Sequence, residues 1–214
     1  MISISLDWQR PLDGVEVIPA ADADPRILAD GEFIRAKTDR RSPRSIRIDD
    51  LSSPVSMLLI NARTTERLAG FVGAFGVPQP LGYNHDGSGE YVSMLISLRD
   101  DLDRGMQLLN NDDDAARVEW ATEHLHQSEF FPSFEWDEGQ RRQRLVFKPS
   151  TLADLMKCEV ALAIEAGAKL HHCERCDAAF LTGHMTGRRA SAVYCSDRCR
   201  MAALRARNAG KGRF

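Results

Sequence analysis

The chain has 214 residues and a mass of 23.9 kDa, which is enough for one ordinary hydrophobic core and a small additional module. Hydrophobic residues make up 43% of the chain, charged residues make up 28%, and the formal net charge is −3, so the composition excludes a mainly disordered protein. Apolar runs such as residues 57–60 are far too short to cross a bilayer, and the first residues lack the basic-then-apolar pattern of a secretion signal. We therefore expect a cytoplasmic protein without membrane contact.

Strand patterns and polar connections alternate at the start of the chain. Residues 2–8 alternate apolar and polar side chains, which predicts a strand, and a second short strand is predicted at residues 33–36. Residues 9–30 are rich in Pro, Asp and Ala and are predicted to form an extended connection. Residues 35–47 carry six basic residues against one acidic residue. We interpret them as a solvent-exposed loop, with a second polyanion contact as the alternative.

Helical spacing of apolar residues dominates the middle of the chain. A helix is predicted to start with Ser53 as N-cap and Pro54 at its first position, and to restart near Thr64. Further helices are predicted over residues 90–110 and 113–127.

A β-hairpin and one more helix complete this part. Residues 134–136 and 144–147 flank a turn and predict the hairpin. Thr151 and Asp154 resemble a capping box for a helix that ends near Gly167. These patterns together predict a mixed α+β fold.

Four cysteines near the C-terminus form the most specific motif. Two residues separate Cys173 from Cys176, three separate Cys195 from Cys199, and 18 residues lie between the pairs. Two close pairs joined by such a loop are how four thiolates reach one tetrahedral Zn²⁺. We predict one structural zinc ion, because four thiolates leave no coordination position for a reacting water. The fifth cysteine, Cys158, is predicted to be a small core residue.

The residues around the cysteines predict a treble-clef-like finger. A tight turn holds the first pair, a short hairpin follows, and a helix capped by Ser196 holds the second pair in its first turn, where free N–H groups favour thiolates. Three histidines are alternative ligands, but beside four cysteines we interpret them as surface residues or neighbours of the site: His171, His172 and His184.

Charge is distributed unevenly. Residues 169–214 hold ten Lys and Arg against three acidic residues, a net +7, so residues 1–168 carry −10 of the total of −3. A basic end on an acidic body suggests a polyanion such as DNA or RNA. The alternative is that the basic end is only solvated or docks on its own acidic body. The candidate nucleic-acid contacts are Arg188, Arg189, Arg198, Arg200, Arg205 and Arg207.

The two cysteine pairs, Phe180, residues 186–189 (TGRR) and residues 194–200 (YCSDRCR) resemble the end of a bacterial protein family. Its members pair a variable ABATE-type N-terminal domain with a CGNR-type zinc finger, and the resemblance implies zinc at the four cysteines and a stress-linked role in transcription. The signature Cys-Gly-Asn-Arg is absent, since residues 199–202 read CRMA. The finger also resembles small bacterial zinc proteins that inhibit DNA gyrase, whose partner is a protein.

We expect a mixed α+β domain over residues 1–149, a connecting helix over 150–168 and the zinc finger over 169–214. The expected function is nucleic-acid binding or transcription regulation, with the finger as contact module. The main alternative is a protein–protein adaptor that docks through the finger. We do not expect an enzyme, because the sequence shows no nucleophile–base pair at a recognisable spacing; a site in the N-terminal domain is the remote alternative.

Overall fold

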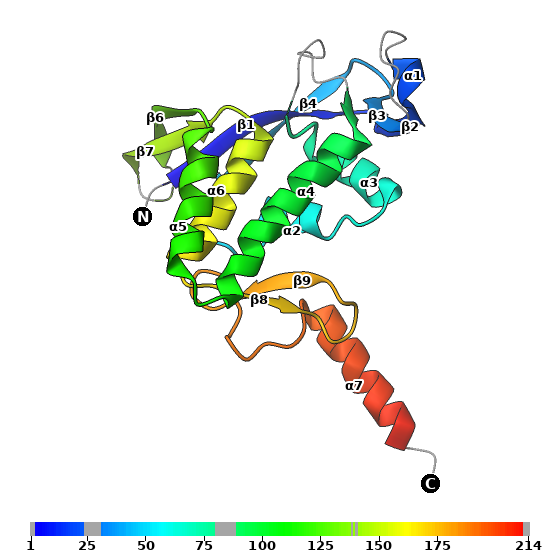
Figure 1. Cartoon of the computed structure of the whole chain (residues 1–214), viewed down its shortest axis with the longest axis vertical. Coiled ribbons are helices and arrows are strands. Elements are labelled where there is room, and N and C mark those ends of the chain that lie inside the picture. Colours follow the sequence, from blue (N-terminus) through cyan, green and yellow to red (C-terminus); the bar gives the residue numbers. More distant parts are fainter. Residues whose placement is uncertain (1–2, 24–30, 80–88, 138, 140, 212–214) are drawn as a thin grey trace.

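The computed structural model describes residues 3–23, 31–79, 89–137, 139 and 141–211, and shows the predicted mixed α+β fold (Figure 1). Helices and sheets form one body, and the C-terminal helix extends away from it. None of the described helices is long and apolar enough to cross a membrane.

The largest sheet has four strands, and it lies across one end of a group of helices (Figure 1). Its strand order is β4 (Arg41–Ile48), β1 (Ser3–Pro11), β7 (Arg142–Pro149) and β6 (Phe130–Asp137). β1 pairs antiparallel with β4 and parallel with β7, while β6 and β7 form the predicted hairpin. Ile4 and Leu6 lie opposite Ile48 and Ile46, and all four are buried, so one face of this sheet belongs to the core.

Three helices pack against one another below the sheets: α4 (Val92–Gln107), α5 (Asp114–His126) and α6 (Leu152–Glu165). Of these, α6 contacts β1 and β7. Nine residues of α6 are buried, which explains why its sequence is apolar almost all round. Gly105 of α4 lets the helices approach closely, because a Cβ there would lie 2.6 Å from the ring of Trp120 on α5. Asp113 and Thr151 cap α5 and α6, which confirms the predicted starts of both helices.

A smaller sheet completes the body, in the order β2 (Val15–Pro19), β3 (Glu32–Ala36) and β5 (Gly89–Tyr91). Three further helices lie nearby in sequence: α1 (Ala20–Ala23), α2 (Val55–Ile60) and α3 (Thr65–Phe75). The Thr64 side chain accepts a hydrogen bond from the Arg67 N–H, which confirms the predicted restart of the helix.

Two predictions for the first 50 residues were wrong. Residues 9–23 are not an extended connection, because they contain the end of β1, β2 and α1, while residues 24–30 of that prediction lie outside the described residues. Most of the basic segment is strand β4 rather than a loop. Arginines fit there because the guanidinium finds partners at the surface: that of Arg44 lies over the Phe75 ring, 4.3 Å from its centroid, and donates to the Ala74 carbonyl at 3.2 Å.

The predicted cap of α2 was also wrong. Ser53 does not cap this helix, which begins at Val55 after Pro54. The Glu159 carboxylate of α6 accepts hydrogen bonds from the N–H groups of Val55 and Ser56, at 2.9 and 2.7 Å. A residue about 100 positions further along the chain therefore caps α2, which no local sequence pattern could indicate.

The last part of the chain forms a small hairpin and a helix, as predicted. Strands β8 (Lys169–His172) and β9 (Ala179–Thr182) pair antiparallel, and α7 (Asp197–Lys211) follows after a loop. Leu170, Ala179 and Leu181 belong to the same buried cluster as the core of the body. The finger hairpin and the body therefore share one hydrophobic core.

Candidate metal centre

The four predicted cysteines come together in space. The Sγ atoms of Cys173, Cys176, Cys195 and Cys199 all lie within 4.8 Å of one another. The three Sγ–Sγ distances among Cys176, Cys195 and Cys199 are each 3.6 Å. A tetrahedral zinc with Zn–S bonds of about 2.3 Å requires sulfur atoms about 3.8 Å apart. The donor set and its spacing therefore fit a four-thiolate metal ion.

The first cysteine pair lies in a tight turn after β8. The Asp177 N–H donates to the Cys173 carbonyl at 2.8 Å, and the Cys173 N–H donates to the Ala178 carbonyl at 3.0 Å. Asp177 has a φ of 57°, a left-handed conformation that aspartate tolerates better than most residues. The turn closes on itself, which directs the Cys173 and Cys176 side chains to one side.

Backbone N–H groups surround the Cys173 thiol. Burial alone would raise its pKa, but hydrogen bonds led by the Cys195 N–H, followed by those of Arg175 and Cys176, outweigh it. The pKa of Cys173 is thereby lowered to about 6. An electropositive turn of this kind stabilises a thiolate ligand at neutral pH.

The Cys195 thiol, in contrast, holds its proton more tightly than a free cysteine. Burial, together with its neighbouring thiols, raises the pKa of Cys195 to about 12. Four thiolates crowded together repel one another, and a bound divalent cation removes this penalty by displacing their protons. The lowered pKa of Cys173 and the raised pKa of Cys195 therefore indicate a cluster in which all four thiols are deprotonated only when a cation is bound.

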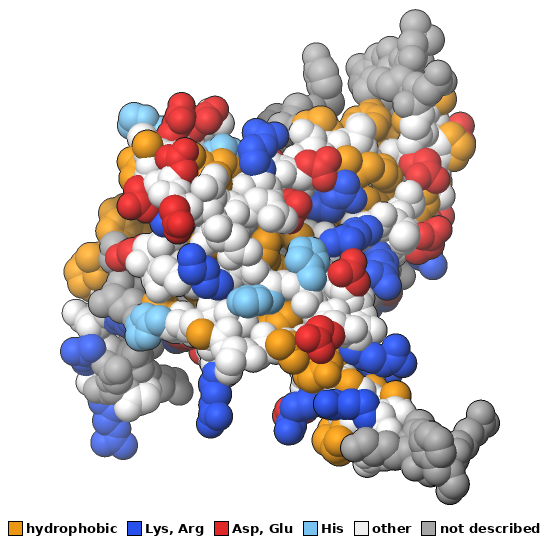
Figure 2. All heavy atoms as spheres, turned by 60° about the horizontal axis from the view of Figure 1, so that its bottom comes forward, with side chains coloured by type: hydrophobic (Ala, Val, Ile, Leu, Met, Phe, Trp, Pro, Cys, Tyr) orange, Lys and Arg blue, Asp and Glu red, His pale blue; other side chains and the backbone are white. Residues whose placement is uncertain are grey.

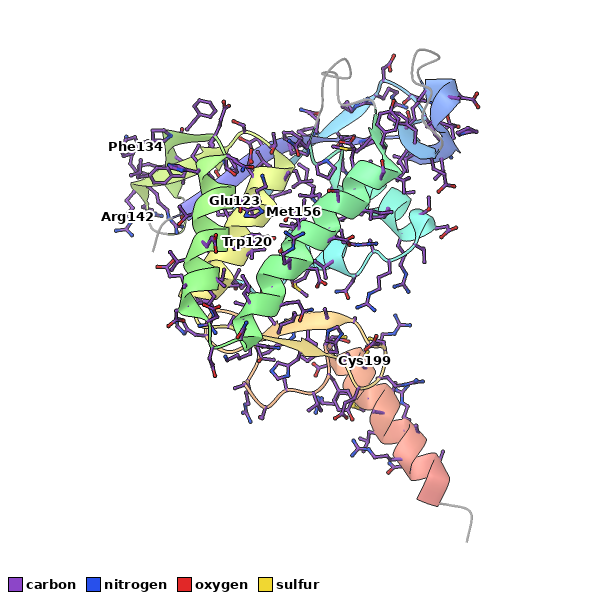
Figure 3. The ribbon with its side chains drawn as sticks, viewed as in Figure 1. Trp120, Glu123, Phe134, Arg142, Met156 and Cys199 are labelled. Atoms are coloured by element: carbon purple, nitrogen blue, oxygen red, sulfur yellow. The ribbon has the colours of Figure 1, made fainter. Side chains whose placement is uncertain are left out.

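The second cysteine pair flanks the start of α7: Cys199 lies in its first turn, as predicted, whereas Cys195 precedes the helix rather than lying in it. The Cys199 N–H donates to the Ser196 hydroxyl at 3.3 Å, so Ser196 caps the helix. Cys195 and Cys199 thereby lie near its N-terminal end, where the helix dipole favours negative charge. Figure 3 shows Cys199 where α7 meets the finger hairpin.

Two asparagines of the body fasten the finger hairpin, and sequence reasoning missed both. The Asn61 amide after α2 donates to the Ala179 carbonyl at 2.9 Å and accepts from the Ala179 N–H at 2.8 Å. Asn110 makes the same pair of bonds with Leu170, at 2.7 and 3.1 Å. Each side chain thus imitates a neighbouring strand for β9 or β8. No sequence motif marks this role, because it depends on residues 60 and 118 positions apart.

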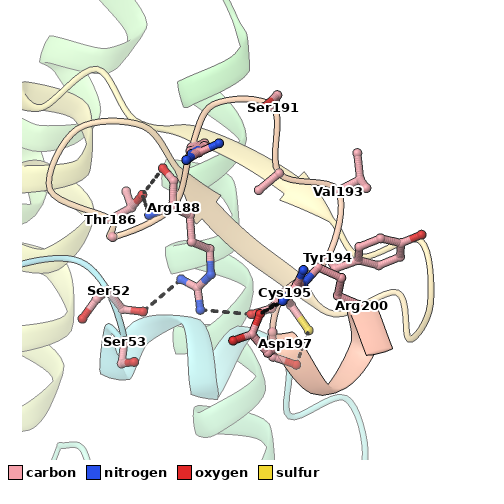
Figure 4. Close-up of a pocket in the computed structure, with 14 residues that line it drawn as sticks. Ser52, Ser53, Thr186, Arg188, Ser191, Val193, Tyr194, Cys195, Asp197 and Arg200 are labelled. Carbon is pink, nitrogen blue, oxygen red and sulfur yellow. Dashed lines mark hydrogen bonds and ion pairs between the residues drawn. The ribbon is translucent and has the colours of Figure 1, made fainter. Parts of the chain in front are cut away.

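Arg188 joins the finger to the body instead of facing solvent. Its guanidinium donates to the Ser52 carbonyl at 2.9 Å and to the Cys195 carbonyl at 3.0 Å (Figure 4). These bonds lie beside a cavity of about 800 Å³ between the loop before α2, the finger loop and the start of α7. Arg189 and Arg200 also line this cavity. Of the six candidate contacts, Arg188 therefore has a structural role that the sequence did not indicate.

The remaining candidate arginines are exposed. Arg200 pairs with Asp197 at 3.1 Å on the first turn of α7, while Arg198, Arg205 and Arg207 are exposed along the same helix. Figure 2 shows basic and apolar side chains on the projecting part of the molecule. Met201 and Leu204 remain 40% and 42% exposed there, so α7 presents a mixed basic and apolar surface.

The other residues considered at the sequence level lie near the finger without joining its cluster. Within the described residues, the groups able to hold a metal comprise only the four cysteines, so none of the three histidines replaces a cysteine. Phe180 is buried in the finger as predicted, with His171 tilted against its ring at 5.9 Å. Cys158 is buried in α6, where burial raises its pKa to about 12, which confirms a core role.

Comparisons with known proteins add no assignment. No protein-family model matches the chain, and no curated protein matches it significantly.

Proposed function

We propose that this protein binds one structural Zn²⁺ through Cys173, Cys176, Cys195 and Cys199. The support is a cluster of four thiols with tetrahedral spacing, with backbone N–H groups directed at one of them. Four sulfur ligands select a thiophilic ion such as zinc over Mg²⁺ or Ca²⁺. The zinc holds the finger in shape and takes no part in catalysis, because all four positions are filled by protein. A reducing cytoplasm would keep these thiols available.

We further propose that the zinc-supported finger binds nucleic acid, with α7 as its contact element and a role in transcription. The carrying observation is that α7 extends from the body with four exposed arginines and one acidic residue, Asp197 (Figure 1). Arginines on several faces of a helix suit phosphate contacts, which give affinity with little sequence choice. We also propose that the chain is related to the CGNR-type zinc-finger proteins, on the basis of the residues around its four cysteines.

A salt titration with matched variants tests nucleic-acid binding. Each phosphate contact on duplex DNA contributes about −0.9 to the slope of log affinity against log salt. Arg205→Ala should weaken DNA or RNA binding similarly for unrelated sequences. It should also reduce the magnitude of this slope by about 0.9, the contribution of one phosphate contact. Arg104→Ala, an exposed arginine of α4, is the control and should change neither quantity. Equal slopes for wild type and Arg205→Ala would contradict a phosphate contact at α7.

Protein docking is the second candidate, and the exposed Met201 and Leu204 favour it. In that case binding would tolerate salt and depend on apolar area. Met201→Gln should then abolish partner binding, whereas nucleic-acid binding should lose little from the same change. The two variants, Arg205→Ala and Met201→Gln, therefore separate the two candidate functions.

A further inference from the structure

The cavity between the finger and the body is large enough for a small molecule, and the proposed function leaves it unused. Its volume is about 800 Å³, within the range of about 300–1,000 Å³ that holds small-molecule ligands. Three segments line it: residues 52–53 before α2, the finger loop within residues 186–195, and the start of α7. We call it the finger cavity. A ligand bound there would contact the body and the finger at the same time (Figure 4).

The lining of the finger cavity carries a net positive charge and many hydrogen-bond donors. Arg188, Arg189 and Arg200 line it together with four serines and one threonine, and Asp197 is the one acidic residue among the described lining residues. The charged side chains therefore sum to +2. A phosphate monoester carries about −1.5 to −2 at pH 7, which matches this charge. The planar guanidinium of arginine also fits phosphate oxygens better than any other side chain does.

Arg188 is already held in the position that such a ligand requires. Its bonds to the Ser52 and Cys195 carbonyls, at 2.9 and 3.0 Å, use two of its five guanidinium N–H groups. Figure 4 shows the side chain reaching from the finger loop towards Ser52. Because these bonds fix its rotamer, a ligand that accepts from the remaining N–H groups would not have to order the side chain.

Arg189 and Arg200 can turn to a ligand at little cost. Arg189 is exposed, and within the described residues no hydrogen bond or ion pair holds its side chain. Arg200 is paired with Asp197, but these two side chains are 62% and 88% exposed, so the pair adds little to stability and is easily exchanged. The start of α7 adds the positive end of a helix dipole to the same cavity.

We propose that the finger cavity binds a phosphate monoester, either a free nucleoside monophosphate or the 5′-phosphate at the end of a nucleic-acid strand. Tyr194 and Val193 also line the cavity, and an aromatic ring offers a base a surface for stacking. The proposal rests on the zinc-supported finger proposed above. It does not rest on phosphate contacts along α7, because Arg198, Arg205 and Arg207 lie outside the cavity lining.

A different explanation for these arginines is that they only offset the charge of the metal cluster, since four thiolates and one Zn²⁺ carry a formal charge of about −2. The contacts do not favour it. Arg188 donates to the carbonyl of Cys195 and not to its sulfur. In the described part of the chain, no hydrogen bond from the side chains of Arg189 and Arg200 reaches a sulfur atom. The metal content of an Arg189 variant separates the two explanations.

Calorimetric titration of AMP into the metal-loaded full chain at low salt tests the proposal. Wild type should bind one AMP per chain, and adenosine, which lacks the phosphate, should not bind. Arg189→Ala should weaken AMP binding about 10- to 100-fold, as expected for the loss of one charge-assisted hydrogen bond. Arg198→Ala is the matched control, because it removes the same charge from an exposed position outside the cavity lining. It should change AMP binding less than about twofold, and both variants should keep their zinc.

Oligonucleotides with a 5′-phosphate or a 5′-hydroxyl distinguish the two sources of the phosphate. If the ligand is a strand end, the phosphorylated strand should bind more tightly than the hydroxyl strand, and Arg189→Ala should abolish this difference. If the ligand is a free nucleotide, AMP should bind while the two strands bind alike.

Three outcomes would overturn the proposal. One is a zinc-loaded wild type that binds AMP no better than adenosine up to roughly 10 mM and does not distinguish the two strands. Another is equal weakening of AMP binding by Arg189→Ala and Arg198→Ala, which would reduce the effect to overall charge. The third is loss of zinc from Arg189→Ala, which would give this arginine a role at the metal cluster.

The proposed nucleic-acid binding along α7 succeeds or fails separately. Arg205→Ala should weaken binding of DNA or RNA and leave AMP binding unchanged, because Arg205 does not line the finger cavity. Salt-sensitive DNA binding in a protein that does not bind a phosphate monoester would therefore reject the cavity alone.

Discussion

Single polar residues decide how the finger is fastened to the body. Asn61 satisfies both backbone groups of Ala179, and Asn110 does the same for Leu170. Removing such a side chain leaves a partly buried donor and acceptor without partners.

Asn61→Ala should therefore lower the free energy of unfolding by about 2–3 kcal/mol, the cost of leaving a buried donor and acceptor unpaired. Asn111→Ala is the control, because that asparagine is exposed after the turn that follows α4, and its effect should stay within about 0.5 kcal/mol. Chemical denaturation measures both. Equal effects would mean that the bonds to Ala179 add nothing to stability.

Glu159 links stability to pH. Burial raises its pKa from 4.5 to about 7, only partly opposed by hydrogen bonds from the N–H groups of Ser56 and Val55. The native state thus holds a proton that the unfolded state releases between pH 4.5 and 7. This contribution to stability is complete at low pH and is lost as pH rises through 7.

Glu159→Gln does not titrate and should lack this pH dependence. The variant loses one good acceptor for α2 at every pH, so it starts less stable than wild type. From pH 5 to pH 8, the free energy of unfolding of wild type should fall relative to that of the variant by up to roughly 3 kcal/mol. Denaturation at both pH values, with zinc in excess, measures it. A constant difference would mean that Glu159 ionises near its usual pKa.

At the scale of elements, sequence patterns were informative wherever the cause of the structure is local. The spacing of apolar residues predicted α4, α5 and α6, and the turn residues predicted the β6–β7 hairpin. Cysteine spacing alone predicted the metal cluster. The same reasoning failed at β4, since its three arginines conceal the alternation of Ile46 and Ile48. It could not find the cap from Glu159 or the bonds from Asn61, because their partners are distant in sequence.

Metal removal should affect more than the finger. If the finger were an independent module, Cys195→Ser would melt residues 169–214 and leave the N-terminal core folded. The structure places Leu170, Ala179 and Leu181 in the core of the body, so loss of the metal should also lower the stability of the body by several kcal/mol. Arg198→Ala, an exposed change on α7 that leaves the cluster intact, is the control and should retain the metal. Hydrogen exchange of α4 and α6 measures this coupling, and unchanged protection there would argue against it.

The whole molecule combines an acidic body, a basic helix and a metal centre between them. The ties at Asn61, Asn110 and Arg188 fix the orientation of the finger hairpin, while α7 extends into solvent (Figure 1). In our account the zinc has one task, which is to hold the first turn of α7 against the finger. Nucleic-acid binding should therefore depend on the metal, even though no phosphate contacts it.

The most direct test measures zinc content and nucleic-acid binding on the same samples of wild type and Cys195→Ser. The account predicts one zinc per chain in wild type, with salt-sensitive binding to DNA or RNA. Cys195→Ser should lose both the metal and the binding. Wild type that holds one zinc per chain but binds no nucleic acid at low salt would contradict the account, and so would a Cys195→Ser variant that binds as tightly as wild type.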